Sequence, residues 1–290
     1  MTPQSVCAVI VTYHPSADIQ DHIRDVLAQV NGLVVVDNGS NEDARRALRG
    51  ASQANGFHLL ENGKNLGIAS ALNQGIQAAK AEGYGWVLLF DQDSKITDGF
   101  VRQMFAAWET HSQRERVASV YPRYLDPVSG TELMVPRTSD GSPILPMTSG
   151  TLMPVWIFER IGWFESEYFI DLVDWEYCFR IRAASFLVTG SEARLLHAAG
   201  FPSNTTILGR ALHSSHHSAD RRYYIARNCV AFYRKYFFIF PGWILKCIYS
   251  ELRDVVVCCL VERERWRKFR NFLLGTWDGI NGKMGERQRL

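Results

Sequence analysis

Apolar and polar residues follow two different periods along the first 120 residues of the chain. Short runs that are mostly apolar predict buried strands at residues 6–12, 33–36, 57–60 and 86–90. Between these runs the apolar residues recur every three or four positions, which predicts helices at residues 18–30, 42–49 and 68–81. Because strands that alternate with helices usually run parallel, we expect a parallel sheet with helices on both faces.

The pattern changes after residue 120. Residues 122–146 are rich in Pro, Gly and Ser and predict an irregular excursion or a weak hairpin. Ordered structure is expected again over residues 149–164, and beyond about residue 200 the pattern is mostly helical, chiefly at 223–236 and 243–272. We therefore expect an α/β domain over residues 1–205 and a mostly helical C-terminal extension over residues 206–290.

Charge is unevenly distributed along the chain. The net charge is +2, but residues 221–290 carry 15 Lys and Arg against 6 Asp and Glu, so the preceding residues are acidic overall. A basic region on an acidic body is typical of a surface that contacts anions, although a solvated basic helix face would give the same counts. The composition is that of a globular chain with a full core, which excludes disordered, collagen-like and disulfide-scaffold proteins.

The cysteines and the hydropathy pattern bear on the compartment. The six cysteines show no CxxC pair or zinc spacing, and Cys258 and Cys259 are adjacent, which disfavours an ordinary disulfide. We expect reduced, mostly buried thiols in a cytoplasmic protein. We expect no signal peptide, because residues 5–12 already have the pattern of a buried strand. No apolar stretch reaches the length of about 18 residues that a membrane-spanning helix needs.

Polar residues follow the predicted strands at their carboxyl ends, where open α/β sheets bind ligands. Asp91-Gln92-Asp93 comes directly after the apolar strand at residues 86–90. Both carboxylates can hold Mg²⁺ or Mn²⁺ together with phosphate oxygens, or one can hold the ion and the other a ribose. The same triplet also occurs in exposed loops, but its place after a fully apolar strand favours a site.

Three further segments have both a functional and a structural interpretation. Asp37-Asn38-Gly39-Ser40 is either a turn or a strand end whose carboxylate accepts a hydrogen bond from a pyrimidine. Residues 65–75 open a helix with small residues, which suits either phosphate binding or close packing on the sheet. Residues 171–176 hold three acids among aromatics, which suits either a general base or an acidic helix N-terminus.

In this order the motifs resemble those of the inverting family 2 glycosyltransferases of GT-A fold. The matching segments are residues 9–13, 36–40, 65–67, 91–93, 149–150, 161–164 and 174–180. Residues 197–200 and 222–228 resemble the L-rhamnosyltransferase branch of that family. The resemblance covers about residues 5–235. It implies a GT-A α/β fold with a mostly parallel central sheet flanked by helices, a nucleotide-binding half over about residues 1–95 and an acceptor half over about 96–205.

The resemblance also implies roles for individual residues. Eight are implied to bind the nucleotide sugar: Thr12, Tyr13, Asp37, Asn38, Asn65, Asp91, Gln92 and Arg227. A Mg²⁺ or Mn²⁺ site is implied at Asp91, Asp93 and His197, although a lone histidine is more often structural. Asp174 matches the catalytic base, with Asp171, Trp175 and Glu176 in support. The acid that usually precedes the base is Val173 here, so Asp171 stays open as the alternative base.

The basic C-terminal region predicts a surface function. Arg263, Arg265, Arg267, Lys268 and Arg270 cluster with Trp266 and Phe269, which suits a helix on an anionic membrane surface. A dimer interface or a helix packed on the core is the alternative. Nucleic acid is not expected, because the body is acidic and contains no recognised module. Processive synthases of the family carry Gln-x-x-Arg-Trp and spanning helices, whereas Glu262 precedes Arg265-Trp266 here, so we expect no polymerising synthase.

We therefore expect a hexosyltransferase that moves L-rhamnose from dTDP-L-rhamnose to a hydroxyl of a lipid-linked or surface polysaccharide of O-antigen type. The reaction would be a metal-assisted single displacement with an Asp base, in the cytoplasm or at the inner face of the plasma membrane. The same fold with another UDP- or dTDP-hexose donor is the first alternative. A sugar nucleotidyltransferase would need a Gly-rich basic loop where Thr12-Tyr13-His14-Pro15 stands, and a non-catalytic sugar-binding scaffold would not need the acids.

Overall fold

The computed structural model describes residues 5–138, 141, 143–144, 146–197, 203–207, 210–214 and 216–287. The chain forms two compact units. The N-terminal unit comprises Met1–Ser166 and Asp174–Ala198, and the C-terminal unit comprises Glu167–Val173 and Ala199–Leu290. The contacts within the chain thus assign the short segment Glu167–Val173 to the C-terminal unit. The division at residue 205 that we expect from the sequence stays a prediction.

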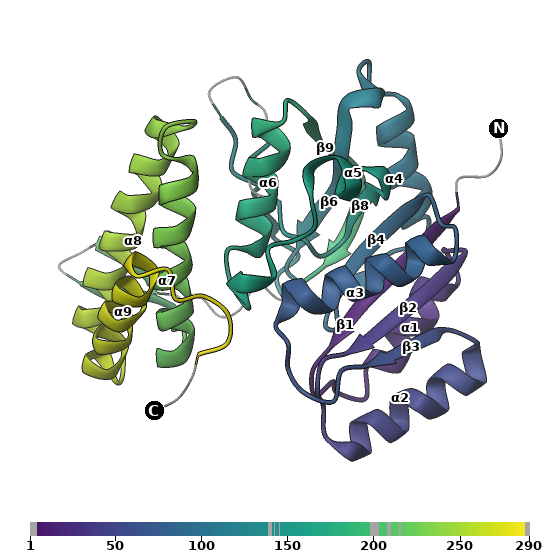
Figure 1. The fold of residues 1–290 in the computed structure, drawn as a ribbon, viewed down its shortest axis with the longest axis horizontal. Coiled ribbons are helices and arrows are strands. Elements are labelled where there is room, and N and C mark those ends of the chain that lie inside the picture. The colour runs from purple at the N-terminus through teal and green to yellow at the C-terminus, as the bar shows by residue number, and fades with distance from the viewer. Residues whose placement is uncertain are drawn as a thin grey trace. The chain divides into compact units, whose positions relative to one another are not determined.

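The N-terminal unit is built on one central sheet (Figure 1). Its first half consists of four parallel strands, β1 (Val6–Thr12), β2 (Gly32–Asp37), β3 (His58–Glu61) and β4 (Trp86–Asp91). Its second half is mixed and contains β5 (Lys95–Ile96), β6 (Val117–Leu125), β7 (Glu132–Leu133), β8 (Thr151–Pro154) and β9 (Leu187–Leu196). The strand order is β3-β2-β1-β4-β8-β6-β9-β5, with β7 paired to β6.

Helices cover both faces of this sheet. They are α1 (Ile19–Leu27), α2 (Glu42–Asn55), α3 (Ile68–Ala81), α4 (Phe100–Glu109), α5 (Trp156–Ile161) and α6 (Val173–Ala183). Ile23 of α1 shares a buried core with Ala8 and Ile10 of β1, whereas Gly75 of α3 lies against Val9. Because neighbouring residues of a strand point to opposite faces, α1 and α3 cover opposite sides.

The parallel half and its helices follow the sequence pattern closely. The strand at residues 6–12 and the helix at residues 68–81 have the predicted bounds, and α2 extends beyond residue 49 until Gly56 ends it in a left-handed conformation (φ 73°). Of the two interpretations of residues 122–146, the weak hairpin is present as the antiparallel pair of β6 and β7. All six cysteines are free and five of them are buried, as the sequence predicts.

The C-terminal unit contains a hairpin and three helices. The hairpin pairs β10 (Ser203–Ile207) with β11 (Arg210–Ser214), which the mostly helical pattern beyond residue 200 does not predict. The helices are α7 (Ala219–Tyr236), α8 (Pro241–Val261) and α9 (Arg265–Ile280). The helical pattern expected over residues 243–272 is divided between α8 and α9, because the chain turns at Glu262 and Glu264. Within the described part of the chain, no helix is long and apolar enough to cross a bilayer.

The turn between α8 and α9 has an electrostatic cause. Glu262 has an extended backbone. Its buried carboxylate forms ion pairs with Lys268 Nζ at 2.6 Å and with Arg222 Nη2 at 3.3 Å. A buried carboxylate is costly unless cations and hydrogen bonds satisfy it, so these two partners favour a helix break that points Glu262 inward. Glu264 follows with a positive φ of 54°, and α9 begins at the next residue.

Candidate active site

Asp91, Asp93 and His197 form a group that could hold a metal ion. Asp91 ends β4, Asp93 follows in the next loop, and His197 comes directly after β9. Their ligand atoms all lie within 4.8 Å of one another. Burial raises the pKa of Asp91, and the charge of Asp93 acts in the same direction, whereas His197 opposes both. The two carboxylates suit Mg²⁺ or Mn²⁺, and an imidazole in the same set favours Mn²⁺, because Mg²⁺ prefers oxygen ligands.

Two buried serines connect the members of this group. The Ser149 hydroxyl accepts a hydrogen bond from the backbone N–H of Asp91 at 3.0 Å and lies 2.7 Å from the Ser94 hydroxyl. The Ser94 hydroxyl in turn lies 3.1 Å from Nδ1 of His197. A histidine whose Nδ1 is engaged in this way presents Nε2 to a cation. The sequence analysis missed Ser94, and the only signal for it is its place directly after Asp93.

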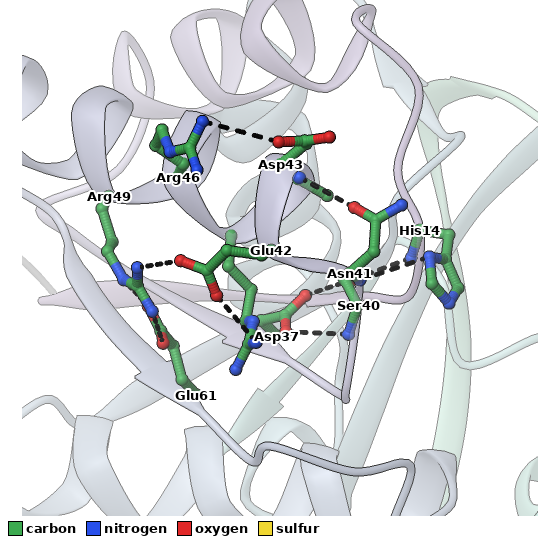
Figure 2. Close-up of polar contacts among 11 residues, drawn as sticks. His14, Asp37, Ser40, Asn41, Glu42, Asp43, Arg46, Arg49 and Glu61 are labelled. Atoms are coloured by element: carbon green, nitrogen blue, oxygen red, sulfur yellow. Dashed lines mark hydrogen bonds and ion pairs between the residues drawn. The ribbon is translucent and has the colours of Figure 1, made fainter.

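Asp37 is the last residue of β2, and its carboxylate forms hydrogen bonds with neighbouring residues (Figure 2). Its buried carboxylate accepts hydrogen bonds from Thr12 Oγ1 at 3.3 Å, from the backbone N–H of Ser40 at 3.0 Å and from the Ser40 hydroxyl. The Ser40 hydroxyl also accepts from the backbone N–H of His14 at 2.8 Å. Asp37 therefore joins the ends of β1 and β2, and its role toward a pyrimidine stays a prediction.

Asn38 and Asn65 organise the neighbouring loops. Asn38 Nδ2 donates to Asn65 Oδ1 at 3.0 Å, and Asn38 Oδ1 accepts from the backbone N–H of Leu66 at 3.0 Å. Asn65 Oδ1 also accepts from the backbone N–H of Gly67, the residue that precedes α3. The two amides thus fix the entry into α3 from the side of β2.

Tyr13 and Gln92 link the ends of β1 and β4. Gln92 Oε1 accepts a hydrogen bond from the backbone N–H of Tyr13 at 2.8 Å. The side chain of Tyr13 is 47% exposed, although it is a large aromatic residue next to a buried strand. An exposed ring at the carboxyl edge of a parallel sheet is positioned to stack on a planar ligand.

Asp174 lies in the first turn of α6, where Oδ1 accepts a hydrogen bond from the backbone N–H of Trp175 at 2.9 Å. It lines a small cavity of about 20 Å³ together with Met147. Tyr124 donates to the carbonyl of Met147 at 2.9 Å. Burial raises the pKa of Tyr124, and the carboxylates of Asp174 and Asp91 both add to that rise. Asp174 and Asp91 both belong to the N-terminal unit, and the charges of both carboxylates act on the Tyr124 hydroxyl.

Glu176 is engaged in a buried ion pair. Its carboxylate accepts from Arg180 Nε at 3.0 Å and also pairs with Nη2 of that residue. Arg180 Nη1 also donates a hydrogen bond to the backbone carbonyl of Trp163 at 2.6 Å, which connects α6 to the residues after α5. These contacts are structural, and a supporting role of Glu176 and Trp175 in catalysis stays a prediction.

Asp171 and Arg227 belong to the C-terminal unit. Asp171 accepts from Arg221 Nε at 2.9 Å, and burial raises the pKa of its carboxyl although Arg221 opposes the rise. Phe169, Asp171 and Leu172 all have positive φ, a strained backbone that is often found beside functional sites. Arg227 is buried, and its guanidinium donates to the carbonyls of Gly285 and Tyr168, so the contacts recorded for it shape the C-terminal unit.

The structure thus brings together several predicted site residues within the N-terminal unit. Asp91 and Asp93 meet His197, Thr12 meets Asp37, Tyr13 meets Gln92, and Asn38 meets Asn65. Of the motif at residues 197–200, only His197 lies among the described residues. Ser94 and Asn62, which donates to Asn38 at 3.1 Å, are additional residues of these loops that sequence reasoning did not select, whereas Ser40 was named only as part of the motif at residues 37–40.

Similarity to known proteins supports the family that the motifs indicate. The family model for glycosyl transferase family 2 matches residues 7–140. The chain is 28% identical over 298 residues to dTDP-rhamnosyl transferase RfbF of Shigella flexneri, and the match covers 97% of each chain.

Solved structures share the fold at low sequence identity. The mannosyltransferase PcManGT from Pyrobaculum calidifontis, solved with GDP-Man and Mn²⁺, matches with a TM-score of 0.57 and 14% identity over 97% of this chain and 89% of that one. TarS of S. aureus matches with a TM-score of 0.52 and 12% identity over 95% of this chain, which spans 43% of the TarS chain. Sequence motifs, family model and fold agree: the chain is a glycosyltransferase of GT-A fold, and its residues 7–140 are similar to glycosyl transferase family 2.

Proposed function

We propose that the chain is an inverting rhamnosyltransferase that uses dTDP-L-rhamnose as donor and a hydroxyl of a lipid-linked or surface polysaccharide, of O-antigen type, as acceptor. The observation that carries this proposal is the similarity to a dTDP-rhamnosyl transferase over 97% of both chains. The cluster of Asp91, Asp93 and His197 supports a donor that carries a diphosphate. Other UDP- or dTDP-hexoses are the alternative donors, and the same assay distinguishes them.

The donor would bind at the carboxyl ends of β1, β2 and β4. Asp91, Asp93 and His197 would hold Mg²⁺ or Mn²⁺, which when bound supplies positive charge for the departing diphosphate. Tyr13 offers an exposed ring for the thymine, and Gln92 fixes the backbone of Tyr13. Asp37 and Asn38 keep the loop that follows β2 in one conformation, which lowers the entropy lost when a nucleotide binds.

Asp174 would act as the general base. An acceptor hydroxyl attacks the anomeric carbon, the bond to the diphosphate breaks with its electron pair, and Asp174 takes the hydroxyl proton. One displacement of this kind inverts the anomeric configuration. Asp171 suits the role less well, because Arg221 lies 2.8 Å from its Oδ1 and would have to move before an acceptor hydroxyl could reach that oxygen.

Replacement of the base tests this assignment. Asp174→Asn removes the proton acceptor but keeps the shape of the side chain, so we expect rhamnosyl transfer to fall at least about a hundredfold while the donor affinity changes little. The measurements are the rate of dTDP release in the presence of acceptor and a calorimetric titration with dTDP-L-rhamnose. Asp171→Asn is the matched control. Turnover that survives in Asp174→Asn and is lost in Asp171→Asn would assign the base to Asp171.

We further propose that the protein works in the cytoplasm and contacts the inner face of the plasma membrane through its C-terminal unit. One face of α8 exposes apolar side chains three or four residues apart, at Leu245, Tyr249, Leu252, Val256 and Leu260. The start of α9 adds the exposed Trp266 among basic residues. Apolar and cationic groups together favour an anionic bilayer surface. Flotation with phosphatidylglycerol vesicles tests this, and a homodimer without vesicle binding would contradict it.

A further inference from the structure

The C-terminal unit contains a large cavity of about 930 Å³. Its walls come from α7, from α9 and from the segment 283–287 that follows α9. Asp91, Asp93 and His197 do not line it, so it is separate in sequence and composition from the proposed donor site. A volume of this size is typical of small-molecule sites in proteins.

The lining is unusually rich in charge, with five cationic and three acidic side chains. Two of the acids have partners within the wall. Asp278 accepts from the Tyr223 hydroxyl at 2.8 Å and lies 3.5 Å from Lys283, and Asp220 lies 3.5 Å from Arg287. The remaining positive charge is carried by arginines, whose planar guanidinium groups match phosphate oxygens in geometry.

Arg287 is held in place with its hydrogen-bonding capacity only weakly used. Its guanidinium carbon lies 4.2 Å above the ring of Tyr223, and its backbone N–H donates to the Tyr224 hydroxyl at 3.0 Å. The guanidinium contacts to Asp220 and Asn271 are both 3.5 Å, at the outer limit of a hydrogen bond. With its side chain only 23% exposed, Arg287 is a preorganised cation that an anion could contact at shorter range.

Arg267 and Arg270 bring two more guanidinium groups to the same cavity. They lie three residues apart on α9, and residues at this spacing share one helix face. The ion pair of Arg267 with Glu264 is long, at 3.5 Å, and exposed to solvent. Such pairs stabilise a protein little, so Arg267 can turn toward a ligand at small cost.

Arg227 also lines the cavity, but the N–H groups of its guanidinium are already hydrogen-bonded within the protein. Its Nη1 and Nη2 donate to backbone carbonyls, and its Nε donates to Asn228 Oδ1 at 3.0 Å. It therefore forms part of the wall. Leu274 and Trp277 of α9 supply an apolar surface beside the arginines. The cavity thus combines a cationic part with an apolar part.

We infer that this cavity binds a diphosphate ester, with the diphosphate on Arg267, Arg270 and Arg287 and the esterified group against Leu274 and Trp277. Three guanidinium groups exceed what one carboxylate would neutralise, whereas a diphosphate carries two to three negative charges. The volume exceeds that of a diphosphate alone, so the ligand carries a further group. The inference goes beyond the proposed function, because the donor cation and the base have no part in it.

Calorimetric titration of the full chain in EDTA tests the inference, with inorganic pyrophosphate and farnesyl diphosphate as probes. We expect the double variant Arg267→Gln/Arg270→Gln to bind farnesyl diphosphate at least about tenfold more weakly than the unmodified chain, because two charge-assisted contacts are lost. Arg263→Gln/Arg265→Gln is the matched control. It removes the same charge from exposed arginines that do not line the cavity, and we expect at most about a twofold change.

The remaining arms separate the outcomes. Farnesyl diphosphate binding at least about tenfold tighter than pyrophosphate assigns the site to a lipid-type diphosphate. Equal affinities would overturn the part of the inference that places an esterified group against Leu274 and Trp277. Asp93→Ala should leave this binding unchanged even if it abolishes transfer, so failure of the donor site and of the cavity are distinguishable. Equal losses in the two double variants would overturn the inference in favour of general surface charge. Absence of binding by both probes at millimolar concentration would overturn it as well.

Discussion

Ser94 has a larger part in the candidate site than its small side chain suggests. Its hydroxyl lies between the Ser149 hydroxyl and Nδ1 of His197, and the residue is fully buried. It therefore fixes the orientation of the imidazole relative to the two aspartates. Groups that orient a metal ligand affect metal affinity almost as strongly as the ligand itself.

Ser94→Ala removes this contact without changing a metal ligand. We expect the affinity for Mn²⁺ to fall about 10- to 100-fold, because the imidazole then samples other orientations. Electron paramagnetic resonance of free Mn²⁺ measures the affinity directly. Ser112→Ala, at an exposed position, is the control. An unchanged affinity in Ser94→Ala would mean that His197 is not oriented by this serine.

His22 is buried in α1 with neither ring nitrogen hydrogen-bonded. Its ring contacts Phe90 at 5.3 Å, and burial, together with the charge of Lys95, lowers its pKa from 6.5 to about 4. The unfolded chain therefore binds a proton at higher pH than the folded one. The contribution of neutral His22 to the free energy of unfolding is therefore complete above about pH 6.5 and is lost as the pH falls toward 4.

His22→Leu should remove this pH dependence. We expect the unmodified chain to lose about 2 to 3 kcal/mol between pH 7 and pH 4 through this residue, whereas the leucine variant loses correspondingly less. At pH 7 the variant should be at least as stable, because a leucine has no unsatisfied nitrogen. Urea denaturation at several pH values measures the difference, and His111→Leu, at a less buried histidine, is the control. Parallel stability curves for the unmodified chain and His22→Leu would contradict the assignment.

At the scale of elements, the sequence pattern was most informative where local and tertiary preferences agree. The strand at residues 6–12 is buried in a sheet that helices cover on both faces, and the helix at residues 68–81 packs on that sheet, so the apolar periods of both are clear. The hairpin of β10 and β11 consists of Thr, Ser, Asn and His as much as of apolar residues, and this composition gives no strand period. The break between α8 and α9 depends on Lys268 and Arg222, which reach Glu262 only in the folded chain.

Helices α7 and α9 approach each other through two glycines. A Cβ atom at Gly275 would lie 2.2 Å from the carbonyl oxygen of Tyr223, and one at Gly279 would lie 2.7 Å from that of Arg227. These distances leave no room for a methyl group, so the helices would have to separate. The close approach also positions Tyr223 and Trp277, which line the cavity of the C-terminal unit.

Gly275→Ala tests this packing. Although alanine favours a helix, we expect the variant to lose about 1 to 3 kcal/mol of stability, because the backbone of α7 cannot yield without losing contacts. Gly50→Ala in α2 is the matched control, since nothing lies within 4 Å of its Cβ position, and it should be neutral or stabilising. Thermal unfolding of both variants gives the comparison. A Gly275→Ala chain as stable as the control would show that the helices are not held this closely.

At the scale of the whole molecule, the residue types of the site could be predicted but not all of their partners. Asp91 and Asp93 are adjacent to a strand, so their place at the sheet edge follows from the α/β pattern alone. His197 is more than a hundred residues away, and only the family resemblance associated it with them. The engagement of Asp37 by Ser40, of Glu176 by Arg180 and of Asp171 by Arg221 depends on tertiary structure, and no local period indicates it.

The proposal that the chain is a metal-assisted rhamnosyltransferase depends on donor binding through Asp91, Asp93 and His197. Calorimetric titration with dTDP-L-rhamnose, in MnCl₂ and in EDTA, tests it most directly when UDP-glucose and GDP-mannose are run beside it. The account predicts that dTDP-L-rhamnose binds tightest, and at least about tenfold tighter with Mn²⁺, a difference of about 1.4 kcal/mol that Asp93→Ala removes. Equal binding in MnCl₂ and EDTA, or an unchanged affinity in Asp93→Ala, would contradict it.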